Sequence, residues 1–169
     1  ADRCFSHGVM LARILEDILD LTKIEIGTIA TKKETIVVGE WLEDIASIAK
    51  QLTIAKPVEV KLVVRSTAPV RIGTDSVRAK QIHLNLVSNA SKFTDEGEIV
   101  IGARGESAAD GKSVLVIDIV DTGIGIEPSR QDAIFDAFEK TKVTKNDRGG
   151  QGLGLTIATQ LATALGGSL

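Results

Sequence analysis

The sequence predicts an α/β sandwich, and three observations support this class. Helical and strand-like segments follow one another in the order helix, strand, helix, strand, strand, helix, which does not fit alternating parallel β-α units. Hydrophobic residues make up 43% of the chain and charged residues 25%, as in soluble globular domains. The 169 residues are enough for one compact domain with a core and a short additional element.

The composition of the chain indicates which ligands and which cellular compartment to expect. The net charge of −3 gives no reason to expect a nucleic acid as the main ligand. The sequence has no apolar run of about 18 residues and no signal-peptide pattern. The single cysteine, Cys4, cannot form an internal disulfide, which is typical of a reducing compartment. We therefore expect a cytoplasmic domain that makes no membrane contact of its own.

Residues 8–26 are predicted to form a long amphipathic helix that ends at Gly27. Its apolar stripe contains Leu11, Ile14, Leu15, Ile18 and Leu21. No other predicted element covers this stripe, so we expect it to pair with a second copy of the chain or with a neighbouring helix. Packing of the stripe on the main domain is the alternative.

A connector, a second helix and a strand are predicted next. The connector spans residues 28–38 and includes a short strand-like stretch at residues 35–38. Residues 40–54 repeat apolar side chains at the spacing of an amphipathic helix, at Leu42, Ile45, Ala49 and Leu52. Pro57 breaks this pattern, and residues 58–65 then alternate apolar and polar side chains as a strand does.

The remaining elements begin with a turn at residues 73–75, in which Thr74 or Asp75 caps a third helix that runs to about Phe93. A strand, a hairpin turn, a strand and a final helix follow at residues 98–104, 108–111, 114–121 and 153–165. Gly166 ends the final helix.

The third predicted helix carries a polar strip. Six polar residues fall within one arc of about 120° on a helical wheel, and apolar residues cover most of the rest. The six are Arg78, Gln81, Asn85, Ser88, Asn89 and Lys92. Asn amides can supply neutral oxygen ligands to a hard divalent ion, and Lys92 can meet a phosphate. A solvated face is the alternative, although such faces usually carry Glu and Lys. His83 lies on the apolar side and is predicted to pack there.

Two glycine-containing segments predict the rest of a nucleotide site. Asp121 ends an apolar strand, where a carboxylate can accept hydrogen bonds from the exocyclic amine of a purine. Gly123 and Gly125 would let the backbone pass close to a flat base, although Gly-x-Gly often marks only a turn. Gly150-Gln-Gly-Leu-Gly154 precedes a helix, and backbone amides there form an anion site. The segment lacks the Gly-Lys-Ser/Thr of a P-loop and the preceding strand of the dinucleotide fingerprint.

Residues 127–149 form a long, poorly periodic segment between these two parts. The segment contains Lys140, Lys142, Lys145 and Arg148. Its place between a base site and a phosphate site predicts a lid, and a solvated charged loop is the alternative. Phe135 and Phe138, three residues apart, would anchor the base of the lid, or else pack in the core.

Four segments resemble, in order, the N, G1, F and G2 boxes of the sensor histidine kinases. The segments are residues 85–94, 121–126, 135–138 and 150–155. The resemblance covers about residues 36–167. It implies the Bergerat (GHKL) ATP-binding fold, with a mixed sheet, helices on one face and one long dimerisation-type helix in front. Type II topoisomerases, mismatch-repair ATPases and a heat-shock chaperone ATPase share this fold. Residues 15–27 also resemble the kinases' second dimerisation helix, which favours a kinase over the other branches.

The resemblance implies roles for matching positions in binding ATP and Mg²⁺. Asn89 would be the Mg²⁺ ligand, with Asn85 supporting the metal and the phosphates. Lys92 would bind a phosphate, and Phe93 would line the base pocket. Asp121 would read the adenine amine, and the last glycine segment would wrap the phosphates. The other implied ATP-binding positions are Gly123, Gly125, Ile126, Phe138, Gly150, Gly152, Leu153, Gly154 and Thr156.

Asn85 also bears on the reaction. Hydrolysing relatives carry a general-base Glu one turn before the metal-binding Asn, and here that position is Asn85. Transfer of phosphate to an imidazole needs no carboxylate to activate water. We therefore expect a protein histidine kinase catalytic domain that donates the γ-phosphate of ATP in two-component signalling. The alternatives are another GHKL-type ATPase or serine-directed kinase, and a non-catalytic ATP-binding dimerisation module.

The resemblance further implies a domain division and partners. Residues 1–27 would be part of a dimerisation and phosphotransfer domain, residues 28–39 a connector, and residues 40–169 the ATP domain without its closing strands. His7 lacks the family's His-Glu/Asp-x-x-x-Pro context, so the phosphoacceptor histidine is expected outside this chain, and self-phosphorylation is not expected. The expected partners are a second copy, through the N-terminal helix, and a response-regulator receiver domain.

Overall fold

The computed structural model describes residues 30–107, 111, 113–136 and 152–169, together with Leu15, Leu19 and Thr22. The chain divides into two compact units. One unit is Lys32–Ile126, and the other joins Ala1–Thr31 to Glu127–Leu169. Among the described residues, no helix has both the length and the apolar character that a membrane crossing requires.

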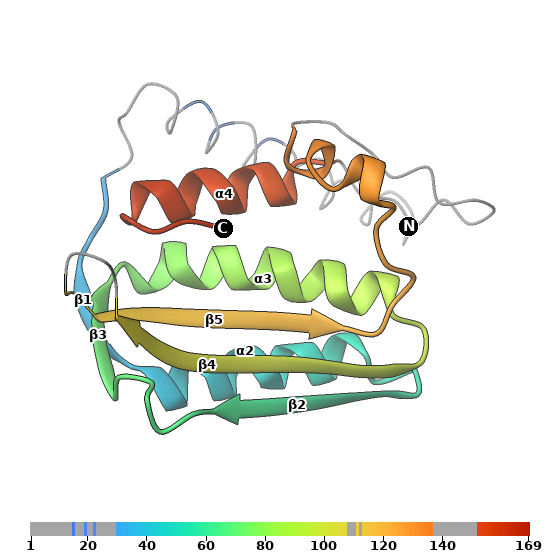
Figure 1. Ribbon diagram of the computed structural model, residues 1–169, viewed down its shortest axis with the longest axis horizontal. Helices are drawn as coiled ribbons and strands as arrows, with labels where there is room; N and C mark the ends of the chain where they lie inside the picture. The colour runs from blue at the N-terminus through green and yellow to red at the C-terminus, as the bar shows by residue number, and fades with distance from the viewer. Residues whose placement is uncertain are drawn as a thin grey trace, which may run out of the picture. The chain divides into compact units, whose positions relative to one another are not determined.

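The unit Lys32–Ile126 is an α/β sandwich (Figure 1). Its elements, in chain order, are β1 (Glu34–Val37), α2 (Val38–Leu52), β2 (Val58–Val64), β3 (Arg71–Thr74), α3 (Ser76–Phe93), β4 (Gly97–Ser107) and β5 (Ser113–Asp121). Strands β2, β4 and β5 form one sheet in that order, with β2 parallel to β4 and β4 antiparallel to β5. Helix α2 packs on β2, α3 packs near β5, and the two helices contact each other. The predicted mixed sheet with helices on one face is confirmed.

Helix α2 forms because its apolar residues recur on one face. Leu42, Ile45 and Ala49 are fully buried, as predicted. The helix begins and ends two residues earlier than expected. Leu52 is 49% exposed, so its assignment to the buried stripe was wrong. The buried place at the end of the helix belongs to Thr53, whose hydroxyl donates to the Ala49 carbonyl at 3.0 Å.

Of the two strands that form a second sheet, the sequence predicted one and missed the other. The strand-like stretch at residues 35–38 corresponds to β1, which pairs antiparallel with β3. The turn predicted at residues 73–75 is wrong for Gly73 and Thr74, because both lie in β3. Each strand has only four residues and pairs with a segment far along the chain, so local alternation gives little sign of it. Asp75, and not Thr74, is the N-cap of α3.

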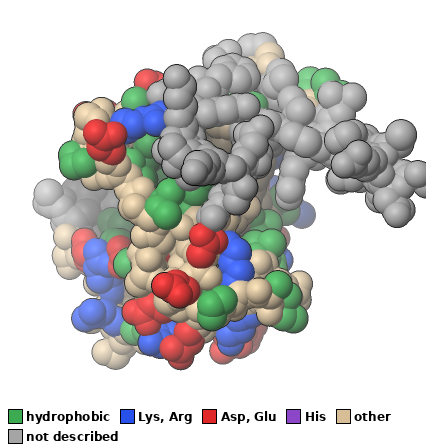
Figure 2. Space-filling view, turned by 90° about the vertical axis from the view of Figure 1, so that its right-hand side faces the viewer, with side chains coloured by type: hydrophobic (Ala, Val, Ile, Leu, Met, Phe, Trp, Pro, Cys, Tyr) green, Lys and Arg blue, Asp and Glu red, His purple; other side chains and the backbone are tan. Residues whose placement is uncertain are grey.

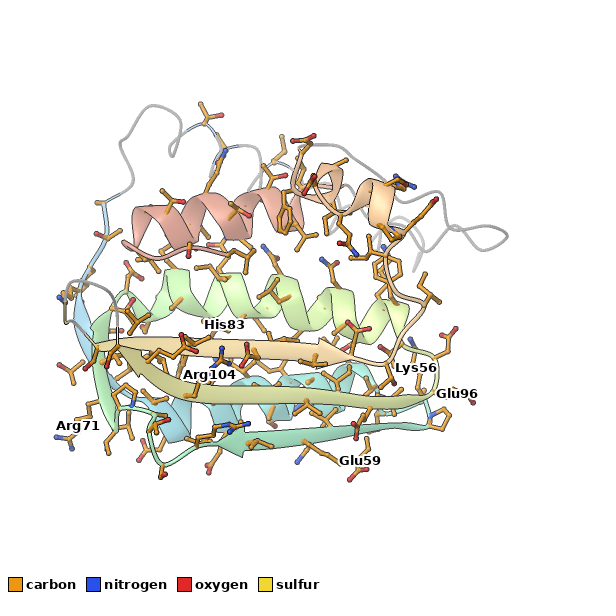
Figure 3. All side chains as sticks on the ribbon, viewed as in Figure 1. Lys56, Glu59, Arg71, His83, Glu96 and Arg104 are labelled. Carbon is orange, nitrogen blue, oxygen red and sulfur yellow. The ribbon has the colours of Figure 1, made fainter. Side chains whose placement is uncertain are left out.

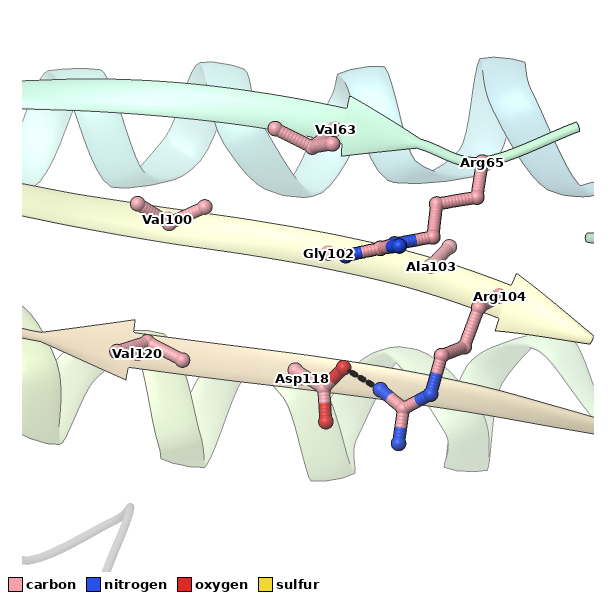
Figure 4. A pocket seen from close by; sticks show the side chains of 8 residues that line it. All are labelled: Val63, Arg65, Val100, Gly102, Ala103, Arg104, Asp118 and Val120. Atoms are coloured by element: carbon pink, nitrogen blue, oxygen red, sulfur yellow. Dashed lines mark hydrogen bonds and ion pairs between the residues drawn. The ribbon is translucent and has the colours of Figure 1, made fainter.

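The face of the three-stranded sheet that points away from the helices carries a shallow hollow of about 500 Å³ (Figure 4). Gly102 has no side chain there, and Val63, Val100 and Val120 line the space around it. Arg104 forms an ion pair with Asp118 across the hollow. None of the predicted nucleotide-binding residues lines it.

After Ile126, the described part of the second unit contains two short 3-10 turns and a helix. The turns are η1 (Pro128–Arg130) and η2 (Ala133–Phe135), and the helix is α4 (Gly154–Ala164). Gly166, at φ +81°, ends α4 as predicted, and its N–H donates to the Thr163 carbonyl at 3.0 Å.

Only part of the predicted N-terminal helix can be compared with the structure. Leu15, Leu19 and Thr22 are helical, and the two leucines are more than half exposed. The other predicted stripe residues, Leu11, Ile14, Ile18 and Leu21, lie outside the described residues.

Candidate nucleotide-binding site

Helix α3, which carries the predicted metal and phosphate residues, is anchored at its first turn by Asp75. The Asp75 carboxylate accepts hydrogen bonds from the backbone N–H groups of Arg78 at 3.0 Å and Lys32 at 2.8 Å. Both N–H groups stabilise the charged carboxylate and so lower the pKa of Asp75, and the N–H of Arg78 has the larger effect. The cap therefore fixes the start of the helix against the start of the unit.

The predicted polar strip lies along α3, outside the core. Asn85 and Asn89 stand one helical turn apart, and both are half-buried. At the start of the strip, Arg78 donates to Gln81 at 2.9 Å. In the part of the chain that the structure describes, no three His, Cys, Asp or Glu side chains gather around a possible metal position. A divalent ion at this strip would therefore be held by neutral amide oxygens and by the charge of a phosphate-bearing ligand.

Lys92 and Phe93 form a cation–aromatic pair at the end of α3. The Lys92 ammonium lies 4.7 Å from the centroid of the Phe93 ring. At this distance the ring face attracts the cation. The predicted phosphate-binding charge and the predicted base-lining ring are thus adjacent.

The ends of α3 and β5 meet at Asp121. Thr94, which directly follows α3, donates its hydroxyl to Asp121 Oδ1 at 3.4 Å. The backbone N–H of Gly123 donates to the same oxygen at 2.9 Å. The backbone N–H of Ile124 donates to the Phe93 carbonyl at 3.3 Å. The structure therefore brings the first predicted segment against the second.

Glycine is favoured at the two positions Gly123 and Gly125 for different structural reasons. A Cβ at Gly123 would lie 2.5 Å from the Phe93 carbonyl oxygen and 2.7 Å from Asp121 Oδ1, so the close approach of the segments requires glycine. Gly125 has φ +70° and open space where a Cβ would be, so its backbone conformation favours glycine. The close approach at Gly123 is to the protein's own backbone, whereas the sequence pattern suggested a bound base.

Two residues at this junction were not predicted from the sequence. Thr94 is fully buried and contacts Asp121, and the ammonium of Lys56 reaches the end of α3 from another loop. Thr94 directly follows Lys92 and Phe93 in the first segment, so its position in the sequence could have identified it as a site residue. Lys56 stands in a loop with no motif, and only the fold reveals it.

Charges are mixed on the side of the molecule where α3 and β5 end. Figure 2 shows Lys and Arg side chains beside Asp and Glu side chains on this side. Lys56 lies 3.6 Å from Asp95, and Lys61 pairs with both Glu59 and Glu98. These pairs are partly exposed, and such pairs add little to stability.

His83 lies away from the polar strip, as predicted. Its ring meets Trp41 edge-on, with centroids 4.8 Å apart and planes at 81°. Its Nδ1 is 2.7 Å from the Ala79 carbonyl oxygen. Burial lowers the pKa of His83, and the Ala79 hydrogen bond opposes that shift. His83 is a packing residue between α2 and α3.

The second unit holds the described part of the predicted phosphate segment. Gly152 has φ +71°, Leu153 is buried, and α4 begins at Gly154. The Thr156 hydroxyl donates to the Phe135 carbonyl at 2.9 Å, so the residue directly after the fourth predicted segment contacts the third. The remaining predicted residues of these segments, Phe138 and Gly150, and the basic residues of the predicted lid lie outside the described residues.

The chain is similar in sequence to proteins of a known family. Residues 74–169 match the family of histidine kinase-, DNA gyrase B-, and HSP90-like ATPases. The autoinducer 2 sensor kinase/phosphatase LuxQ of Vibrio parahaemolyticus is 39% identical over 165 residues, which cover 96% of this chain and 19% of LuxQ. Sensor protein TorS of Escherichia coli is 35% identical over 164 residues, which cover 96% of this chain and 17% of TorS. The chain thus spans about a fifth of the length of these curated relatives.

A solved structure supports the same assignment. Full-length ShkA in complex with AMPPNP matches with a TM-score of 0.79 and 28% sequence identity, over 95% of this chain and 32% of the ShkA chain. The family match itself extends over more than half of this chain. The chain therefore belongs to the histidine kinase-, DNA gyrase B-, and HSP90-like ATPase family and is homologous to the sensor histidine kinases.

Proposed function

We propose that this domain binds ATP with Mg²⁺ and donates the γ-phosphate to a histidine outside this chain, as the catalytic part of a sensor histidine kinase. One observation carries the proposal. Asp121, a carboxylate at a strand end, is held against the end of the helix that carries Asn85, Asn89 and Lys92. A base-reading group and a metal- and phosphate-binding strip therefore occur in the same unit.

Asp121 would read the adenine base. Its two described hydrogen bonds, from Thr94 and Gly123, both use Oδ1. Oδ2 is then the oxygen that can accept a hydrogen bond from the exocyclic amine of adenine. Because Thr94 and Gly123 fix the carboxylate, it would pay little ordering entropy when the base binds.

Asn89 would hold Mg²⁺, with Asn85 one turn before it. Mg²⁺ supplies charge neutralisation at the phosphates when it is bound. The amide oxygens of Asn85 and Asn89 are neutral ligands, so the negative charge that holds Mg²⁺ would come from the phosphates of ATP. Mg²⁺ and ATP would therefore bind together. Lys92 would add a positive charge for a phosphate oxygen.

Within the second unit, the backbone N–H groups of Gly152, Leu153 and Gly154, where α4 begins, would bind a phosphate. Thr156 would lie behind these groups, where its hydroxyl donates to the Phe135 carbonyl. That bond would connect the start of α4 to the segment that contains Phe135. Gly150 and Phe138 are proposed to complete this part.

Asn85 supports phosphotransfer over hydrolysis. An amide cannot act as the general base that activates water, whereas a carboxylate at this position could. The sensor kinases that match the chain support the further proposals: homodimerisation through the N-terminal helix, a response-regulator receiver domain as the final acceptor, and a cytoplasmic location.

A transfer experiment tests the proposal. The chain is incubated with Mg²⁺ and γ-labelled ATP, alone and with a separately produced dimerisation domain of a sensor kinase that carries the acceptor histidine. We expect acid-labile label on the added domain, none on His7, and slow release of free phosphate. The Asn89→Ala variant should transfer no label. Rapid phosphate release by the chain alone would place it among the hydrolysing ATPases, and label on serine would indicate a serine-directed kinase.

A further inference from the structure

Lys56 binds the end of α3, although it belongs to the loop between α2 and β2 (Figure 3). Its Nζ donates to the backbone carbonyl of Ser91 at 2.6 Å and to that of Thr94 at 2.9 Å. Oδ1 of Asp95 is 3.6 Å away. One ammonium therefore holds three groups in the segment where α3 ends.

A lysine suits the chemistry of this position. The last carbonyls of an α-helix have no donor within the helix, and they form the negative end of the helix dipole. An ammonium has three donors and a charge of the opposite sign. The Lys56 side chain is 29% exposed, so solvent screens this charge only in part.

The loop that presents Lys56 is itself fixed at both ends. The backbone N–H of Lys56 donates to the Thr53 carbonyl, and its carbonyl accepts from the N–H of Val58, both at 2.8 Å. The N–H of Gly97 donates to the Pro57 carbonyl at 3.1 Å. The ammonium is thus presented from a loop that is tied to the end of α2 and to the start of β4.

Thr94 joins Lys56 to the nucleotide site. Its carbonyl accepts from Lys56, and its hydroxyl donates to Asp121 at 3.4 Å. Its side chain is fully buried, so it cannot shift without disturbing its neighbours. The preceding residue, Phe93, is bound through its carbonyl to the N–H of Ile124. A displacement of the end of α3 would therefore move Asp121 as well.

We infer that Lys56 is a positioning residue of the nucleotide site. Its ammonium fixes the last turn of α3 and, through Thr94, sets the place of the Asp121 carboxylate that reads the base. The inference rests on the proposed function, because it takes Asp121 as the group that binds the adenine amine. Lys56 touches neither ATP nor the metal in this account.

The test compares three variants of the chain by calorimetry with Mg²⁺-ATP and with Mg²⁺-ITP, below the unfolding temperature of each variant. ITP carries an oxygen where ATP carries the exocyclic amine, so the ratio of its Kd to that of ATP reports how well Asp121 is placed. Lys56→Met keeps the methylene stem and loses the donors, and Lys56→Arg keeps a cation. Lys61→Met is the matched control, because Lys61 also pairs with two carboxylates but on the outer face of the sheet.

We expect Lys56→Met to weaken ATP binding about tenfold and to bring the ITP/ATP ratio near one, since small displacements of binding groups are costly. Lys56→Arg should recover most of the selectivity, and Lys61→Met should stay within about twofold of wild type.

If Lys56→Met melts lower but keeps both the ATP affinity and the ratio, Lys56 has only a structural role and the inference is wrong. Should Lys56→Met not fold, Lys56→Gln takes its place; loss of folding in both also overturns the inference. Absence of ATP binding by wild type would instead contradict the proposed function.

Discussion

The hydroxyl of Thr94 donates to the carboxylate of Asp121, with 3.4 Å between Oγ1 and Oδ1. This bond links the residue after α3 to the last residue of β5. Thr94→Val keeps the shape of the buried side chain and removes the hydroxyl. We predict that it weakens ATP binding by about threefold to tenfold, the effect of one hydrogen bond, in calorimetry. Thr94→Ser, which keeps the hydroxyl, should bind more tightly than Thr94→Val; equal affinities would show that the bond does not orient Asp121.

Gly123 is predicted to be irreplaceable for reasons of space. A methyl group there would lie 2.5 Å from the Phe93 carbonyl oxygen, so Gly123→Ala must push the ends of α3 and β5 apart. We expect a loss of about 1–3 kcal/mol in the free energy of unfolding by urea, the usual cost of overpacking. Gly39→Ala is the control, because Gly39 lies in α2 and a Cβ added there would meet open space. It should be neutral or stabilising by up to about 1 kcal/mol. Equal effects of the two changes would refute the close approach.

The half-buried His83, which packs against Trp41, predicts a pH dependence of stability. Burial lowers the pKa of His83 in the folded state below the usual histidine value of about 6.5, so the unfolded chain binds a proton more readily. The contribution of His83 is therefore favourable above about pH 6.5 and is lost as the pH falls toward its folded pKa. The slope cannot exceed about 1.4 kcal/mol per pH unit for one proton.

Urea unfolding at pH 7.5 and 5.5 measures this effect. Trp41 is the only tryptophan of the chain and packs against His83, so its fluorescence reports the unfolding directly. The loss of stability between the two pH values should be smaller in His83→Gln than in wild type. An identical loss in both proteins would assign the pH dependence to other groups.

Asn89 is predicted to carry the magnesium dependence of ATP binding. Its amide is the proposed metal ligand, so Asn89→Ala should lose about tenfold in ATP affinity with Mg²⁺ present and little without it. Ser88→Ala is the matched control, because Ser88 is the exposed neighbour on the same helix. Calorimetry with Mg²⁺ or with a chelator separates the two effects. If Asn89→Ala retains the full gain from Mg²⁺, the metal is held elsewhere.

The strongly periodic parts of the fold were predictable from the sequence. Helices α2 and α3 and the strands β4 and β5 follow from local spacing, and the short turn between β4 and β5 also predicts that these two strands pair. Strand β3 was missed because four residues pair with a distant strand of equal length. Leu52 was misplaced because only the packing at the end of α2 decides which residue is buried.

In the candidate site, too, local motifs could be read from the sequence, whereas contacts between distant residues could not. Asn85, Asn89, Lys92 and Asp121 were predicted as site residues because each stands in a short local motif. The ammonium of Lys56 reaches Ser91 across 35 positions of sequence, and spacing cannot reveal such a contact. The sequence also contains no sign that a side chain at Gly123 would clash with the Phe93 carbonyl, because Phe93 lies on another element.

The most direct measurement of the central claim is calorimetry of Mg²⁺-ATP binding by wild type, Asp121→Asn and Asp118→Asn. Both changes replace a carboxylate by an amide on β5, but Asp121 contacts Thr94, directly after α3, whereas Asp118 pairs with Arg104 on the outer face. We predict that wild type and Asp118→Asn bind with similar affinity, and that Asp121→Asn loses ATP binding while its circular dichroism stays unchanged. Full affinity in Asp121→Asn would contradict the account.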